Sequence, residues 1–287
     1  MDAEHALSKP QTCGHHITES QPMKADGLSV LSLGGGVNST ALLFGLVERG
    51  TPPDLILFAD TGAEHDRTYA HLKHVDEWLQ AKGMQPVVRV NNAAREGFPH
   101  KSLEDECLNN KTLPSLAFGF KGCSVKWKRQ PMDRFVKSWP PAKDQWAQGN
   151  RVTRLIGIDA GERHRGKIPD DKLFTYEFPL IEWGWGRAEC IEAIESQGMP
   201  VPGKSACWFC PATTKPEILK LAHNRPDLFD RAVKMERNAA SELNQVKGLA
   251  RHHSWESIVE ADSRQIKMPF FVIPSEPCLC FDGSDSE

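Results

Sequence analysis

Short apolar runs alternate with longer amphipathic stretches over most of the chain. The short runs are bounded by turn residues, which predicts buried strands at 28–33, 54–59, 86–90 and 152–158. Apolar residues at helical spacing predict helices at 38–49, 66–82, 128–138, 187–197, 214–223 and 226–245. Because strands and helices alternate, we expect an α/β fold with a central parallel sheet, followed by a mainly helical C-terminal subdomain.

The pattern also divides the chain. We expect a flexible N-terminal segment at 1–25, a nucleotide-binding α/β domain at 26–185, and a helical C-terminal region with a mobile acidic tail at 186–287. The stretch 91–121 shows no clear period and contains prolines and scattered glycines. We therefore expect it to be a long irregular loop near an active site.

Three consecutive glycines, at 34–36, follow the first predicted strand. Without a Cβ, their backbone N–H groups can converge on an anion. The polar residues at 38–40 begin the next predicted helix, whose positive end favours phosphate. The spacing matches neither the Walker A motif nor the Gly-x-Gly-x-x-Gly fingerprint. The pattern thus indicates a nucleotide site of another kind.

The second predicted strand ends in Asp60, Thr61 and Gly62 and leads into a helix. Two successive strand, turn and helix units predict parallel strands, with a ligand bound at their carboxyl ends. An aspartate at such a strand end can bind a ribose hydroxyl, Mg²⁺ or a substrate group, and it can also simply cap the turn. Both readings of Asp60 stay open on the sequence alone.

Residues 32–40, Ser-Leu-Gly-Gly-Gly-Val-Asn-Ser-Thr, resemble the PP-loop Ser-Phe-Ser-Gly-Gly-Lys-Asp-Ser-Thr of the phosphoadenosine phosphosulfate reductase family. That family belongs to the adenine nucleotide alpha hydrolase superfamily. Further similar segments follow in family order at 122–131, 157–165, 179–183 and 207–211. The resemblance implies the Rossmann-like fold of that superfamily and a bound adenine nucleotide such as ATP.

The resemblance also implies site residues. Those expected to bind the nucleotide are Ser32, Gly34, Gly35, Gly36, Asn38, Ser39, Thr40, Asp60, Thr61, Gly62, Gly157, Glu162 and Arg165. Those expected to act in catalysis are Asn38, Asp60 and Lys126. The chain departs from the family at Val37, where a lysine is usual, and at Asn38, where an aspartate is usual. These changes remove a phosphate-binding cation and a carboxylate that could help to hold Mg²⁺, so binding is a safer expectation than turnover.

Cys207 and Cys210 form a Cys-x-x-Cys pair that can bind one metal centre. A pair of buried apolar cysteines and a redox dithiol are the alternatives. The resemblance implies that Cys123 joins the pair, and Cys107 is the leading fourth ligand because it lies nearby in the sequence. The family carries a [4Fe-4S] cluster at its own cysteines, but one of its paired cysteines is Ser124 here, so zinc remains the alternative.

Several other residues receive a plainer interpretation. His71 and His74 lie one turn apart on a predicted helix and are expected at its surface. Ser205 is expected to be an ordinary loop hydroxyl, and Trp208 to pack in the core.

Charge and composition limit the partners. The net charge of −3 gives no overall basic field for nucleic acid, and the sequence contains no apolar run long enough to span a membrane. The N-terminus lacks the apolar core of a signal peptide, so we expect a cytoplasmic protein with no membrane partner. A homo-oligomer is left open.

We expect an enzyme that binds an adenine nucleotide and carries out sulfur-related or nucleotide-activating chemistry beside a cysteine-bound metal. The leading form is adenylation with pyrophosphate release, using Mg²⁺, followed by sulfur transfer to a small-molecule or nucleic-acid acceptor. A sulfonucleotide reductase and a non-catalytic nucleotide-binding module with a structural metal are the alternatives. Either enzyme would need a sulfur or electron donor, which could be a protein. A reductase would also need a mobile cysteine, for which Cys278 and Cys280 are candidates.

Overall fold

The structure is a computed structural model and describes residues 27–264. The segments 1–26 and 265–287 lie outside the described residues, and with them Cys13, Cys278 and Cys280. No helix between residues 27 and 264 has the length and apolar character needed to cross a bilayer.

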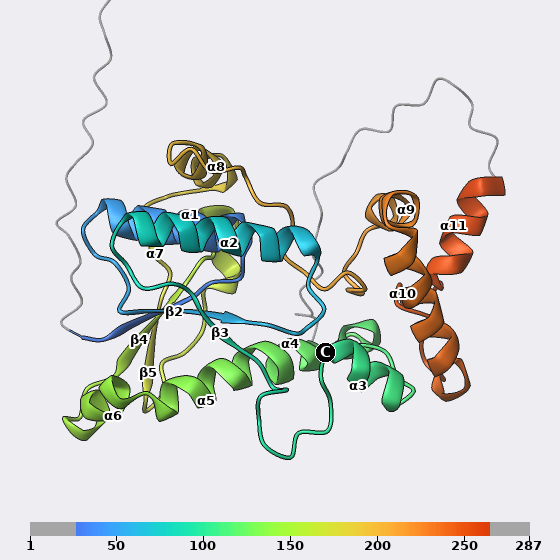
Figure 1. Cartoon of the computed structure of the whole chain (residues 1–287), viewed down its shortest axis with the longest axis horizontal. Coiled ribbons are helices and arrows are strands. Elements are labelled where there is room, and N and C mark those ends of the chain that lie inside the picture. Colours follow the sequence, from blue (N-terminus) through green and yellow to red (C-terminus); the bar gives the residue numbers. More distant parts are fainter. Residues whose placement is uncertain (1–26, 265–287) are drawn as a thin grey trace, which may run out of the picture.

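Five parallel strands form one sheet in the order β3-β2-β1-β4-β5 (Figure 1). They are β1 (Ser29–Ser32), β2 (Leu55–Ala59), β3 (Val88–Val90), β4 (Val152–Ile156) and β5 (Phe174–Glu177). In the central register, Val30 lies opposite Leu55 on one side and Arg154 on the other. The α/β fold with a central parallel sheet, predicted from the sequence, is confirmed.

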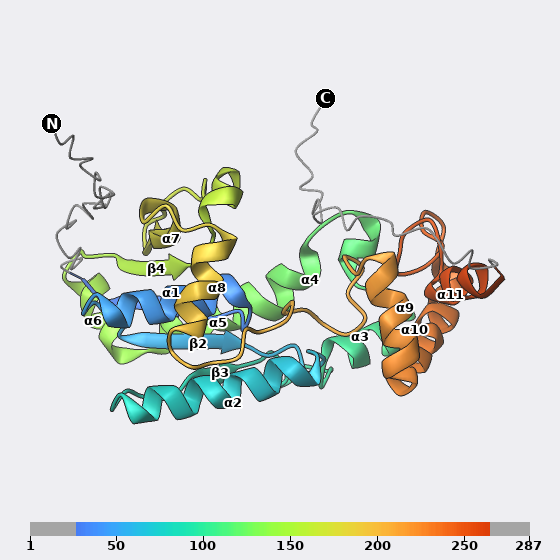
Figure 2. The ribbon, with the colours of Figure 1, turned by 90° about the horizontal axis from the view of Figure 1, so that it is seen from above.

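Helices cover both faces of the sheet (Figures 1 and 2). One face carries α1 (Val37–Glu48), α2 (Asp66–Ala81), α7 (Pro179–Glu182) and α8 (Arg187–Glu195). The other face carries α5 (Gln130–Ser138) and α6 (Pro140–Ala147). Because β2 is covered on both sides, every one of its residues is buried, which is why it reads as a continuous apolar run.

The order of the strands indicates where a ligand would bind. The chain moves outward from β1 to β3 and then crosses to β4 on the other side of β1. Ligands in open α/β sheets bind at the carboxyl ends of strands where the order reverses in this way. The glycines after β1 and Gly157 after β4 therefore face the same crevice.

A second core joins the middle of the chain to its C-terminal helices. Its helices are α3 (Leu103–Asn109), α9 (Lys215–Asn224), α10 (Pro226–Ala239) and α11 (Trp255–Arg264). Trp127, Phe209, Met235 and Trp255 are among its fully buried side chains. By contrast, α8 packs on α1 in the core of the sheet. The division of the chain at residue 185 stays a prediction.

The stretch 91–121 is not one irregular loop, as the sequence suggested. It contains α3, which begins where the Ser102 hydroxyl accepts a hydrogen bond from the Asp105 N–H, and a 3-10 helix, η1 (Ser115–Phe118). Two further 3-10 helices are η3 (Ala160–Arg165) and η4 (Ala240–Glu242).

A continuous helical rod runs through α4 (Gly122–Ser124), a π-helical turn η2 (Val125–Arg129) and α5. Pro131 lacks the N–H that an ordinary α-helical ladder would require, and the turn before it is widened. The widened turn follows Cys123 directly.

Glu236 ties the loop before α11 to α10. Its carboxylate accepts hydrogen bonds from the backbone N–H groups of Leu249 at 2.7 Å and Trp255 at 3.0 Å. The residue is only 5% exposed. Burial outweighs these hydrogen bonds and raises the pKa of Glu236 to about 7.

This burial predicts a pH-dependent stability. A carboxyl whose pKa is raised in the folded state stabilises the fold at low pH and loses that contribution as the pH rises through the folded value. Relative to Glu236→Gln, the wild-type free energy of unfolding should fall as the pH rises from 4.5 through about 7. The fall should be roughly 3 kcal/mol. Urea titrations of both proteins across this range measure it, and parallel curves would contradict it.

Candidate functional site

The glycine loop is held by its own backbone and by Ser39. The Gly34 N–H donates to the Ser39 hydroxyl at 3.1 Å, and that hydroxyl donates to the Gly36 carbonyl at 3.2 Å. Gly35 has a φ of 74°, a conformation that favours glycine. The loop ends at the N-terminus of α1, where free N–H groups and the helix dipole favour an anion.

Thr40 connects this loop to α2. Its hydroxyl donates to the Gly36 carbonyl at 2.9 Å, so it accepts the hydrogen bond from His71 Nε2, also at 2.9 Å. His71 is only 4% exposed, and burial, with a smaller contribution from His74, lowers its pKa to about 4. The imidazole is therefore neutral, and the expectation of a surface histidine was wrong for His71.

Asn38 pairs with a carboxylate that the sequence did not single out. Its amide Nδ2 donates to Asp159 Oδ2 at 2.9 Å, while Asp159 Oδ1 accepts from the Glu162 N–H at 3.0 Å. Asp159 is 7% exposed, and Asn38 Oδ1 is buried with no hydrogen-bond partner. The loop therefore has a carboxylate beside it even though its own aspartate is replaced.

Glu162 and Arg165, two residues expected to bind the nucleotide, form an ion pair with each other. Arg165 donates to the Glu162 carboxylate at 2.7 Å on the partly exposed surface of η3. Gly157 has a structural reason to be glycine, because a Cβ there would lie 2.7 Å from the N and Cα of Ser39. It allows the end of β4 to approach the start of α1.

Asp60 organises the turn after β2. Its Oδ1 accepts from the Gly62 N–H at 2.7 Å and from the Tyr69 hydroxyl at 2.8 Å. Burial and the bond to Asp60 raise the pKa of Tyr69, so its hydroxyl keeps its proton. Gly62 has a φ of 69°, which the turn requires.

One short stretch, residues 204–208, joins this region to the cysteines. The Ser205 hydroxyl donates to the Gly34 carbonyl in the glycine loop. Two residues later, Cys207 Sγ lies 3.2 Å from the Thr61 hydroxyl, just after β2. Backbone bonds from Trp208 N–H to the Ala63 carbonyl, at 3.1 Å, fix the same stretch. Ser205 is thus more than a loop hydroxyl, and its isolated position in the sequence gave no signal of this role.

The four cysteines named from the sequence all belong to the second core. Cys107 comes from α3, Cys123 from α4, and Cys207 and Cys210 from the turn before α9. Burial raises the pKa values of the Cys107, Cys207 and Cys210 thiols, and the charges of neighbouring cysteines contribute. All four are free thiols. Within residues 27–264, no three His, Cys, Asp or Glu groups are placed to hold one metal ion.

An ion pair with one buried partner lies beside Cys207. The Lys128 ammonium is 2.8 Å from Glu64 Oε1, and the Glu64 side chain is fully buried, with Oε2 unpartnered. Burial alone would lower the pKa of Lys128, but Glu64 and Cys207 raise it, so the lysine stays charged. Lys128 is thus a lysine whose pKa is affected by Cys207 and Cys210.

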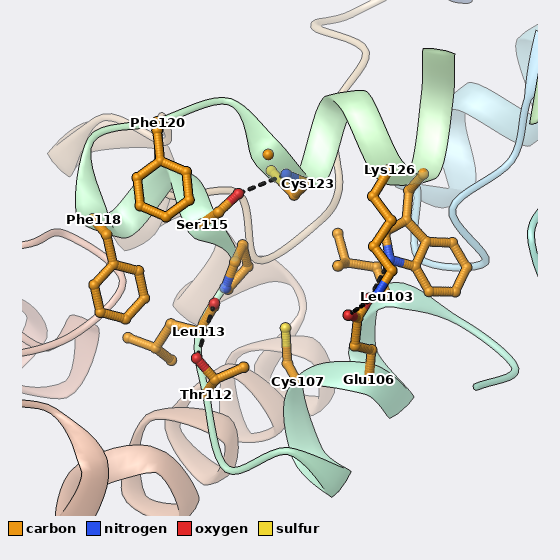
Figure 3. Close-up of a pocket in the computed structure, with 13 residues that line it drawn as sticks. Leu103, Glu106, Cys107, Thr112, Leu113, Ser115, Phe118, Phe120, Cys123 and Lys126 are labelled. Carbon is orange, nitrogen blue, oxygen red and sulfur yellow. Dashed lines mark hydrogen bonds and ion pairs between the residues drawn. The ribbon is translucent and has the colours of Figure 1, made fainter. Parts of the chain in front are cut away.

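A cavity of about 220 Å³ opens on the other side of the cysteines (Figure 3). Cys107 and Cys123 line it, and the Cys107 sulfur points up toward Cys123. Phe118 and Phe120 form one side, and Phe120 is 59% exposed. Lys126, predicted as catalytic, also lines this cavity.

No family model and no curated protein matches the chain. Among solved structures, the U34-tRNA thiolase NcsA from Methanococcus maripaludis with its [4Fe-4S] cluster is similar, at 13% sequence identity and a TM-score of 0.41. The similarity covers 78% of this chain and 75% of that chain. At this low identity, the function of the chain has to be argued from its own residues.

Because Gly157 lies close to the backbone of Ser39, we expect a side chain at position 157 to destabilise the fold. Gly157→Ala should displace the start of α1 and destabilise the fold by about 1–3 kcal/mol, because the added Cβ meets backbone that cannot rotate away. Gly27→Ala is the control, since a Cβ there comes no nearer than 3.9 Å to another group. Thermal melting compares the two, and equal melting temperatures would show that α1 is not packed this closely.

Proposed function

We propose that the chain is a PP-loop enzyme that binds an adenine nucleotide over residues 34–40 and couples it to sulfur-related chemistry at a metal held by cysteines. The nucleotide phosphates would lie at the N-terminus of α1, within the crevice between β1 and β4. Activation of an acceptor with release of pyrophosphate, followed by sulfur transfer, is the reaction that these two parts support best.

The contact of the stretch 204–208 with both parts carries the proposal. Ser205 bonds to Gly34 in the glycine loop, and Cys207 meets Thr61 after β2. Two sites that merely coexisted in one fold would not need to share one stretch of chain. The shared stretch supports the proposal because it brings Cys207 close to the loop that would bind the nucleotide.

The chemistry of the cysteine donors suits a thiophilic metal, because thiolates are soft ligands. Cys107, Cys123, Cys207 and Cys210 all belong to the second core, but they would have to close around the metal, since no three of these four described residues are placed to hold one ion. Because burial favours the neutral thiols, binding of a metal cation is what would stabilise the thiolates. In a [4Fe-4S] cluster each iron takes one thiolate, so four cysteines from three segments can serve it, and zinc is the alternative. A cluster would supply a site for sulfur or electron transfer.

Asp159 would replace the missing carboxylate of the loop. It lies within a hydrogen bond of Asn38, whose unpartnered Oδ1 offers a second oxygen. Carboxylate and amide oxygens are suitable ligands for Mg²⁺. Asp60 is the other candidate carboxylate, and its Oδ1 already accepts from Gly62 and Tyr69.

A second hollow, of about 360 Å³, supports an anionic acceptor. It lies between the start of α2 and α9, beside the backbone of Ala206 and Trp208. Its basic side chains are Arg67, Lys204, Lys220 and Arg225, against the acidic Asp66 and Glu217. This excess of positive charge would favour a phosphate-bearing small molecule or nucleic acid.

Anaerobic purification tests the metal and the activity together. Wild-type protein should contain iron and acid-labile sulfide, and should release pyrophosphate from ATP when an acceptor is present. Cys123→Ala and Cys210→Ala should lose the iron because each removes a ligand. Cys190→Ala is the control, since Cys190 is also a free thiol but lies on α8 in the core of the sheet.

The outcomes separate the candidate functions. Iron without pyrophosphate release, but with reduction of a sulfonucleotide, would favour the reductase. Zinc in place of iron, with ATP binding but no turnover on small-molecule or RNA acceptors, would favour a binding module. Iron that survives both cysteine substitutions would remove the cysteine centre altogether.

The hydrogen bond between Asn38 and Asp159 can be tested by exchanging the amide and the carboxylate between the two positions. Asn38→Asp should weaken ATP binding by about tenfold, because it places two carboxylates within hydrogen-bond distance. Asp159→Asn should keep the hydrogen bond but lose the gain in ATP affinity that Mg²⁺ provides. The double exchange restores one amide and one carboxylate, so it should behave like the wild type.

Calorimetry of ATP binding with and without Mg²⁺ measures all four proteins. The family pattern alone would predict an improvement in Asn38→Asp, so that variant distinguishes the structural argument from the motif. Full Mg²⁺ dependence in Asp159→Asn would exclude Asp159 and leave Asp60 as the carboxylate.

A further inference from the structure

The cavity beside Cys107 and Cys123 contains a charged pair at one side. The Lys126 ammonium bonds to the Glu106 carboxylate, which also accepts from the Trp127 indole N–H. The Lys126 side chain is 41% exposed and that of Glu106 is 14% exposed, so the lysine end of the pair remains open. In Figure 3 the pair and the phenyl rings lie on opposite sides of the two cysteines.

This cavity reaches the cysteines from a different direction than the nucleotide does. Cys207 contacts Thr61 and lies beside Glu64, on the side of β2 and the glycine loop. Cys107 and Cys123 line the cavity, and no residue of the glycine loop does. A small molecule can therefore approach the sulfur atoms while a nucleotide occupies the loop.

Opposite charges held side by side complement a zwitterion. The carboxylate of an amino acid would bind the Lys126 ammonium, and its ammonium group would bind Glu106, through charge-assisted hydrogen bonds. The cavity volume of about 220 Å³ corresponds to about seven water molecules. A ligand the size of one amino acid fits this volume, whereas larger ligand pockets start at about 300 Å³.

We propose that the cavity binds a small zwitterionic thiol, with its charged groups on Lys126 and Glu106 and its sulfur toward Cys107 and Cys123. Phe118 covers the apolar part of the ligand, and the exposed Phe120 forms the rim through which it enters. The site deepens the proposed function, on which it rests for its role, because it gives a low-molecular-weight thiol direct access to the cysteine-bound centre.

Binding of L-cysteine tests the proposal, measured by calorimetry under anaerobic conditions with a phosphine as the reductant. L-cysteine should bind at one site per chain. L-serine, which lacks the sulfur, and 2-mercaptoethanol, which lacks both charges, should each bind about tenfold more weakly or worse. This comparison uses the unchanged protein, so it does not depend on the folding of any variant.

Substitutions then locate the site. Lys126→Met should weaken L-cysteine binding by about ten- to a hundredfold, through loss of a charge-assisted hydrogen bond, and Lys126→Arg should retain most of the affinity. Lys121→Met is the matched control, because Lys121 is an exposed lysine on the same stretch that does not line the cavity. Leu113→Trp should block binding by filling the cavity.

The results separate this inference from the proposed function. Protein that contains iron but shows no saturable L-cysteine binding up to about 10 mM would overturn the inference and leave the cysteine centre standing. Equal affinity in Lys126→Met and wild type, or equal binding of 2-mercaptoethanol, would overturn it as well. L-cysteine binding that depends on Lys126 in a protein without iron would support the cavity and count against the proposed metal centre.

Discussion

The contact of residues 204–208 with the ends of β1 and β2 is the constraint on which the arrangement of the site depends. Ser205 bonds to the Gly34 carbonyl, and Cys207 packs against Thr61, so the turn that carries the cysteine pair cannot move without disturbing the glycine loop. The backbone bond between Trp208 and Ala63 holds the same stretch from its other end. The C-terminal helices are thereby fixed to the sheet at the point where a ligand would bind, and the second core between α3 and α10 makes that attachment rigid.

Charge in the crevice is distributed differently from what the loop sequence alone indicates. Val37 and Asn38 suggest a weakened site, but the structure brings Asp159 to Asn38 from the end of β4. Parallel neighbours β1 and β4 end at the same edge of the sheet, so a residue lost from one strand end can be replaced from the other. Gly157 makes this replacement sterically feasible, because a side chain there would push β4 away from α1.

Secondary structure could be predicted from the sequence where the pattern of apolar residues is local and regular. Periodicity located α1, α2 and four of the five strands, because their burial is regular along the chain. It missed β5, an edge strand with only one buried side chain, and α3, which spans only seven residues. The roles of His71, Ser205 and Asp159 could not be read in the same way. Each acts through a partner far along the chain, and a single polar residue carries no mark of such a partner. The sequence named Lys126 as a catalytic residue, which stays a prediction, and gave no signal that Lys128 pairs with Glu64.

The helical segment around the π turn η2 contacts two different environments. Cys123 and Lys126 line the cavity, whereas Lys128 meets the buried Glu64 beside Cys207. A buried charged pair is expensive to desolvate, and it is tolerated here because Glu64 also accepts a hydrogen bond from Thr61. The charge of Lys128 offsets only part of the rise that burial and Glu64 cause in the pKa of Cys207. The cysteines thus have a lysine charge on the side of Glu64 and an open cavity on the side of Cys107 and Cys123. These two different sides would suit the proposed metal centre. An acceptor could be activated at the glycine loop while a small thiol reaches the cysteines through the cavity.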